Sequence, residues 1–139
     1  MRHDERSNLV QELKEYPVFT DCTEGDIDAL VAEADEFSLP PAWSLLQQGI
    51  PADALYVVRE GTARVYYGRR PVATVGPGDV VGEMAFLGGG QRRATVSSVT
   101  RLSGIRVDYD RLADMVADHP RIGEAIKRVY RSRVTATAS

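Results

Sequence analysis

Residues 77–96 read PGDVVGEMAFLGGGQRRATV, and this stretch decides the fold of the 139-residue chain. An apolar strand ends at Gly82, one helical turn follows over residues 84–87, and three glycines then precede Arg92. A glycine before a short helix lets the backbone approach a ligand closely, and the first amides of the helix have no acceptor within it. The segment therefore predicts an anion site at a strand–turn–helix junction.

Two charged side chains in this segment complement each other chemically. The planar guanidinium of Arg92 has the geometry to bind two phosphate oxygens. The carboxylate of Glu83 only accepts hydrogen bonds when it is ionised, which suits a sugar hydroxyl. Together the two groups fit the sugar–phosphate end of a nucleotide.

The segment resembles the phosphate-binding cassette of the cyclic-nucleotide-binding domain family. That pattern is G-E-aliphatic-A-aliphatic, a variable loop and then R-x-A-[TS]-V, and here it stands at residues 82–87 and 92–96. The spacing from Glu83 to Arg92 is also similar to that of the family. The likeness covers residues 16–133 and includes the N-terminal elbow at residues 17–19, early strands at 45–49 and 55–58, and the turn at 77–79.

The resemblance implies a role for each cassette residue. Glu83 would accept a hydrogen bond from the ribose 2′-OH of cyclic AMP or cyclic GMP, and Arg92 would neutralise the cyclic phosphate. Backbone amides at Ala85, and around Arg93 and Ala94, would complete the phosphate site. No metal and no further cofactor are implied, and cyclic AMP is the expected ligand in preference to cyclic GMP.

The cover for the purine and the choice of purine stay open. Tyr130 in the last helix is the candidate cover, with Arg131 and Arg133 as alternatives, but Tyr130 also continues an apolar stripe. Arg93 stands where the family usually has a small residue that helps to set purine preference. The complete expected ligand set is Gly82, Glu83, Met84, Ala85, Arg92, Arg93, Ala94 and Tyr130.

The remaining sequence predicts mainly β structure with flanking helices. Short β-branched segments separated by Gly or Pro fill residues 37–107 and predict a sandwich or barrel. By the resemblance, this is an eight-stranded β-barrel, or jelly roll, with the cassette and its short helix at residues 82–96. We expect one domain over residues 1–139.

Helices are expected on both sides of the barrel. Residues 1–36 predict an N-terminal helical bundle, in which Thr23 is a candidate N-cap followed by acidic residues and an apolar stripe. Residues 108–134 predict C-terminal helices, with Asp108 as the cap of the first and Pro120 at the start of the second.

Composition and charge exclude several function classes. No apolar stretch approaches the roughly 18 to 20 residues that span a bilayer, and no secretory signal follows the charged N-terminus. The single cysteine, Cys22, cannot form an internal disulfide, so we expect a cytoplasmic protein. Metal-dependent catalysis needs clustered histidines, but His3 and His119 both lie outside the strand region, and we expect no enzyme activity.

Three functions remain compatible with the sequence. A sensor domain would bind the cyclic nucleotide and signal through its flanking helices to an unassigned effector. A transcription factor would need a recognition helix, for which no room follows the last helix, so direct DNA binding is not expected unless the chain is a fragment of a larger regulator. A degenerate pocket would leave an interaction module, in which residues 122–130 would support a homodimer.

Overall fold

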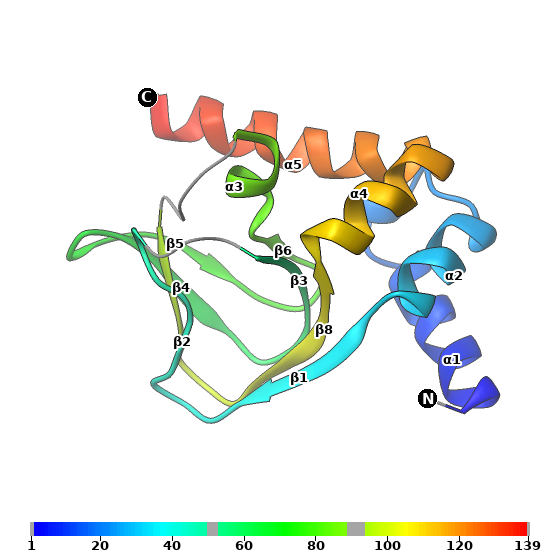
Figure 1. Ribbon diagram of the computed structural model, residues 1–139. Helices are drawn as coiled ribbons and strands as arrows, with labels where there is room; N and C mark the ends of the chain where they lie inside the picture. The colour runs from blue at the N-terminus through cyan, green and yellow to red at the C-terminus, as the bar shows by residue number, and fades with distance from the viewer. Residues whose placement is uncertain (1, 50–52, 89–93, 139) are drawn as a thin grey trace.

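The computed structural model describes residues 2–49, 53–88 and 94–138 (Figure 1). The described strands form two four-stranded antiparallel sheets with the orders β1-β8-β3-β6 and β2-β7-β4-β5. The prediction of an eight-stranded jelly roll with flanking helices is confirmed. The strands are β1 (Asp35–Leu39), β2 (Ser44–Leu46), β3 (Ala54–Glu60), β4 (Ala63–Tyr67), β5 (Arg70–Val75), β6 (Val80–Val81), β7 (Thr95–Ser98) and β8 (Leu102–Asp108).

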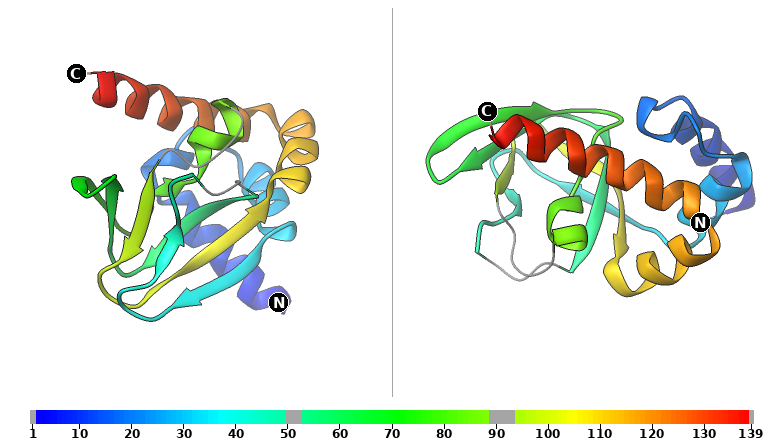
Figure 2. Two further views of the ribbon diagram at one scale, coloured as in Figure 1. Left: turned by 60° about the vertical axis from the view of Figure 1, so that its left-hand side comes forward. Right: turned by 90° about the horizontal axis from the view of Figure 1, so that it is seen from above.

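The helices lie outside the barrel, and one of them packs against the cassette. In Figure 1, α5 runs along the top of the molecule above α3, while α1 and α2 lie on the right. In the view from above in Figure 2, α3 lies beside α5, and the two helices pack against each other. The helices are α1 (His3–Lys14), η1 (Pro17–Phe19), α2 (Glu24–Ala32), α3 (Glu83–Gly88), α4 (Tyr109–Asp118) and α5 (Pro120–Ala138).

Two hydrophobic cores meet at the sheet that contains β3. Leu55 and Val57 belong to the core between this sheet and the helices, whereas Val58 belongs to the core inside the barrel. Burying each such side chain stabilises the fold by roughly 1.5–3 kcal/mol. The helical stripes predicted from the sequence supply the outer core with Leu9, Val10, Leu13, Ile27, Leu30, Val31, Leu112, Met115, Ile122, Ala125 and Ile126.

The N-terminus of α2 has the side-chain cap that the sequence predicts. The backbone N–H of Asp26 donates to Thr23 Oγ1 at 3.1 Å, and the backbone N–H of Thr23 donates to Asp26 Oδ2 at 2.9 Å. This reciprocal pair is a capping box, which satisfies two amides that the helix itself leaves without acceptors.

The predicted cap of α4 is wrong. Asp108 does occupy the N-cap position, but its side chain makes no capping hydrogen bond. Its Oδ1 lies 2.9 Å from Nη1 of Arg106, which is two residues earlier on the same face of β8. A charge-assisted bond to a guanidinium is stronger than a neutral one, so the carboxylate pairs there instead.

A buried carboxylate joins α2 to the corner between α4 and α5. Asp26 is only 6% exposed. Its Oδ1 lies 3.0 Å from Nδ1 of His119, and its Oδ2 lies 3.8 Å from Nη1 of Arg121. Because His119 follows α4 and Pro120 begins α5, this cluster fixes the corner against the N-terminal helices.

Among the described residues, no helix has the length and apolar character needed to cross a membrane. The same part of the chain contains no group of three or more His, Cys, Asp or Glu side chains arranged to hold a metal ion.

Candidate functional site

The cassette begins at a backbone reversal between β6 and α3. Gly82 has φ +98°, in a region that residues with a Cβ atom rarely occupy. This conformation turns the chain from the strand into α3, so that Glu83 is the first helical residue. The helical turn expected over residues 84–87 is therefore confirmed, with one additional residue at each end.

Glu83, the first residue of α3, is completely buried next to α5, although its side chain is a carboxylate. Its exposed fraction is 0%. Its Oε1 accepts a hydrogen bond from Nη1 of Arg133 in α5, and the two groups form an ion pair. The Arg133 side chain is 32% exposed, so the guanidinium reaches in from the rim of the site.

The second oxygen of this carboxylate is the most unusual feature of the site. Glu83 Oε2 is buried and has no hydrogen-bond partner among the residues that the structure describes. A buried acceptor without a donor costs roughly 1–3 kcal/mol, and native proteins keep few of them. The arrangement suits a ligand that brings a hydroxyl or N–H donor to this oxygen.

Three further residues of the predicted ligand set lie in the described part of the cassette. Met84 is half-buried in α3, and Ala85 lies in the same helix with its backbone close to the reversal at Gly82. Ala94 is half-buried immediately before β7. The two ends of the cassette therefore belong to the helix under α5 and to a central strand of the second sheet.

The structure describes the predicted residues of α5 but not the two predicted arginines of the cassette. Arg92 and Arg93 lie outside the described residues, so their expected contacts remain predictions. In α5, Tyr130 is half-buried and Arg131 is exposed. Arg133, weighed only as an alternative cover for the purine, is the α5 residue that reaches Glu83.

The contact between Arg133 and Glu83 was missed from the sequence, although one signal was present. Ile122 and Ile126 are buried on one stripe of α5, and Arg133 continues that stripe seven residues after Ile126. A basic residue on the inner stripe of an amphipathic helix indicates a buried acidic partner. The sequence does not say which carboxylate that partner is.

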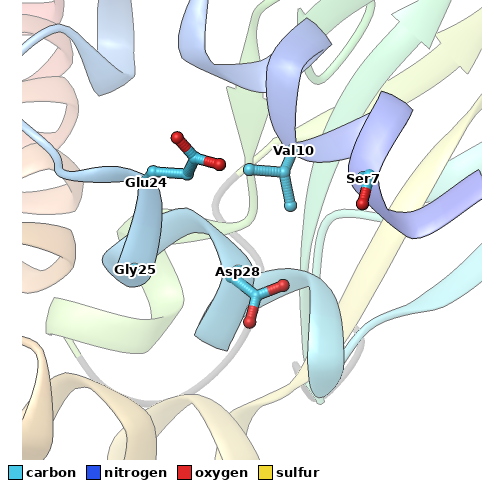
Figure 3. Close-up of a pocket in the computed structure, with 5 residues that line it drawn as sticks. All are labelled: Ser7, Val10, Glu24, Gly25 and Asp28. Carbon is cyan, nitrogen blue, oxygen red and sulfur yellow. The ribbon is translucent and has the colours of Figure 1, made fainter. Parts of the chain in front are cut away.

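A pocket of about 250 Å³ lies elsewhere, between α1 and α2 (Figure 3). Its acidic groups already have partners, since Asp28 binds Arg6 at 2.8 Å and Glu24 lies 3.6 Å from Lys14. None of the predicted ligand residues contributes to it. Its lining residues are Ser7, Val10, Glu24, Gly25 and Asp28.

Comparison with known families identifies the family of this domain. Residues 36–119 match the model of the family described as "Cyclic nucleotide-binding domain". The chain belongs to this family. The matched segment includes Glu83 and ends at the corner between α4 and α5. Helix α5 and its Arg133 therefore lie outside the segment that the family model matches.

Curated relatives carry the same domain within longer proteins. The CRP-like cAMP-activated global transcriptional regulator of Mycobacterium tuberculosis is 28% identical over 116 residues, covering 80% of this chain and 52% of the relative. The cAMP-dependent protein kinase regulatory subunit of Yarrowia lipolytica is 31% identical over 130 residues, covering 90% of this chain and 35% of the relative. The chain thus spans about half or less of the length of these relatives.

Solved structures of the cyclic nucleotide-binding domain show the same fold. The cAMP-bound PfPKA-R structure has a TM-score of 0.85 at 16% identity, and the alignment covers 97% of this chain and 46% of that one. The Thermus thermophilus catabolite activator protein has a TM-score of 0.78 at 22% identity, with 88% and 60% covered.

Proposed function

We propose that this domain binds a cyclic nucleotide, cyclic AMP in preference to cyclic GMP, and acts as a regulatory sensor that signals through its flanking helices. The observation that carries the proposal is the buried carboxylate of Glu83, whose Oε2 has no partner in the described part of the chain. It lies in the segment whose sequence matches the phosphate-binding cassette.

The chemistry of Glu83 supports a ribose hydroxyl as the donor. Arg133 pairs with Oε1, which leaves Oε2 as the oxygen that can accept a hydrogen bond from the ligand. A ribose 2′-OH that donates to Oε2 would satisfy a buried oxygen to which no described residue donates. A charged acceptor makes this bond stronger than a neutral one.

The phosphate side of the site is assigned by the resemblance of the cassette. In this proposal Arg92 binds the cyclic phosphate, and backbone amides at Ala85, Arg93 and Ala94 complete the contact. The purine extends toward α5, where Tyr130 is half-buried and available as its cover. The preference for cyclic AMP is supported by the relatives and solved structures whose names include cAMP.

In this proposal, the signal starts at the ion pair that connects α5 to the carboxylate of Glu83. Because Arg133 pairs with Glu83, a ligand that binds Glu83 changes the surroundings of an α5 side chain directly. Couplings of this kind between a site and a distant element typically amount to about 1–3 kcal/mol and act in both directions. The effector that would respond is unassigned, and the proposed role is non-catalytic and cytoplasmic.

One observation favours a second function. Glu83 Oε1 is already occupied by Arg133 of the same chain, so α5 itself would cover the carboxylate and the domain would act as an interaction module. In that case the exposed part of α5 would form a homodimer interface and no cyclic nucleotide would bind.

Isothermal titration calorimetry separates the two functions. We expect the wild type to bind cyclic AMP more tightly than cyclic GMP and to bind 5′-AMP weakly. Arg92→Ala removes a charged partner of the ligand, which should weaken cyclic AMP binding about 30-fold to several thousand-fold. Arg64→Ala, at an exposed arginine of β4, is the matched control and should leave the affinity unchanged. Absence of binding by the wild type at millimolar cyclic AMP and cyclic GMP would contradict the proposal and favour the interaction module.

A further inference from the structure

The first turn of α4 is held by Tyr109 and not by a side-chain cap. Asp108 pairs with Arg106 and leaves the helix without a capping side chain. The backbone N–H of Tyr109 instead donates to the carbonyl oxygen of Asp53 at 2.9 Å. The opening amides of a helix have no acceptor within it, so this bond satisfies one of them and attaches α4 to the segment before β3.

The Tyr109 side chain attaches the same turn to the cassette. Its hydroxyl donates a hydrogen bond to the carbonyl oxygen of Gly82. Its ring packs on the ring of Phe86, with centroids 5.1 Å apart and an interplanar angle of 49°. These two partners lie on either side of Glu83, one residue before it and three residues after it.

The bond to Gly82 acts on the direction of Glu83. The carbonyl of Gly82 and the N–H of Glu83 belong to one planar peptide unit, so a donor that fixes the carbonyl also fixes the Cα atom of Glu83. Gly82 has φ +98° and, as a glycine, has neighbouring conformations open to it. The phenol of Tyr109 therefore selects one orientation of this peptide.

We propose that Tyr109 is a positioning residue for the candidate site, which orients Glu83 toward the ligand through its hydrogen bond to the carbonyl of Gly82. This inference rests on the proposed function, because the orientation of Glu83 matters only where a ligand binds it. Since α4 leads directly to the corner with α5, Tyr109 gives the cassette a second connection to the C-terminal helices beside the Arg133 ion pair.

The test compares Tyr109→Phe with Tyr67→Phe, a half-buried tyrosine on β4, as the matched control. Calorimetry with cyclic AMP and 2′-deoxy cyclic AMP measures how strongly each protein prefers the ligand with the 2′-OH. Loss of the hydroxyl bond should reduce this preference about 3- to 10-fold in Tyr109→Phe. A residue with a purely structural role would weaken both ligands equally and leave the ratio unchanged.

A second measurement needs no ligand. Hydrogen exchange of the backbone amides in residues 83–88 and 109–112 should be about 3- to 10-fold faster in Tyr109→Phe than in wild type, with α1 unaffected. If the wild type binds cyclic AMP but Tyr109→Phe leaves the ligand ratio unchanged, the inference about Tyr109 is wrong and the proposed function stands, whatever the exchange rates. If the wild type binds neither ligand, the proposed function fails and the positioning role fails with it, and the exchange rates then show only whether Tyr109 holds α3. Should Tyr109→Phe not fold, Phe86→Leu removes the ring contact alone and should accelerate exchange in the same two segments, whereas unchanged exchange there would contradict the inference.

Discussion

Glu83 and Asp26 are both buried carboxylates, with 0% and 6% of their surface exposed, but the protein treats them differently. Asp26 accepts from the Thr23 backbone, faces His119 Nδ1 at 3.0 Å and has Arg121 at 3.8 Å. Arg133 donates a hydrogen bond to Oε1 of Glu83, whereas no described residue donates one to Oε2.

In the proposed function, this difference separates a structural carboxylate from one that binds a ligand. Each buried polar group costs free energy unless a partner satisfies it. Asp26 has partners on both oxygens, all from the fold itself, and it joins α2 to the α4–α5 corner. Glu83 retains an open acceptor, and retaining it lowers stability unless a ligand supplies the donor.

The largest expected effect concerns Glu83. Glu83→Gln keeps the shape of the side chain but removes the charged acceptor, so cyclic AMP affinity should fall by about 30-fold or more. The free energy of unfolding should change by less than about 1 kcal/mol, because the variant also removes a buried charge. Calorimetry and urea denaturation measure the two quantities. A cyclic AMP affinity equal to that of wild type would contradict the proposal that Glu83 binds the ligand.

Asp26→Asn should show the opposite pattern. An amide disrupts the capping box and the contact with His119, so the free energy of unfolding should fall by about 2 kcal/mol. Cyclic AMP affinity should stay within about twofold of wild type, since the polar partners of Asp26 are Thr23, His119 and Arg121, which lie outside the cassette. Urea denaturation with calorimetry on the same preparation checks this, and a variant that is stable yet fails to bind would contradict it.

A double-mutant cycle sharpens the assignment of Arg133. Arg133→Met leaves the buried carboxylate of Glu83 without its counter-charge, whereas Arg133→Met with Glu83→Gln removes both charges. We expect a coupling free energy of about 1 kcal/mol in urea denaturation, modest because Arg133 is partly exposed. Additive effects of the two substitutions would show that the ion pair contributes nothing to stability.

The smallest effect is the pH dependence of the Asp26 contribution. Burial raises the pKa of Asp26, but hydrogen bonds from Thr23 and His119 and the charge of Arg121 outweigh it and hold the pKa below its usual value. A carboxyl whose folded pKa is lowered stabilises the fold above its unfolded pKa, and this stability is lost as pH falls through the folded value. The stability difference between wild type and Asp26→Asn should therefore shrink between pH 5 and pH 3 in urea denaturation. A difference that grows over this interval would contradict the lowered pKa.

The features that the sequence predicts correctly depend on residues close together in the chain. Thr23 and Asp26 are three positions apart, and their capping box follows from local spacing. The reversal at Gly82 is likewise local, since glycine readily adopts a positive φ. The strands and apolar stripes are periodic patterns, and the structure forms them where they are expected.

The features that sequence reasoning missed depend on how distant elements pack. Glu83 and Arg133 are 50 positions apart, and they meet only because α5 packs against α3. The expected cap by Asp108 was wrong for the same reason on a smaller scale. The Asp108 carboxylate can accept either from the first amides of its own helix or from Arg106 on the adjoining strand. The helix-capping propensity of aspartate does not decide between these two partners.

The most direct measurement is a calorimetric comparison of cyclic AMP with 2′-deoxy cyclic AMP, carried out on wild type and on Glu83→Gln. If the open oxygen of Glu83 accepts the ribose hydroxyl, wild type should prefer cyclic AMP by about 10-fold or more, the usual contribution of a hydrogen bond to a charged group. Glu83→Gln should show a clearly smaller preference for cyclic AMP than wild type, because a neutral acceptor makes a weaker hydrogen bond than a charged one. Equal affinity of the wild type for both ligands would contradict the assignment of this oxygen to the ligand.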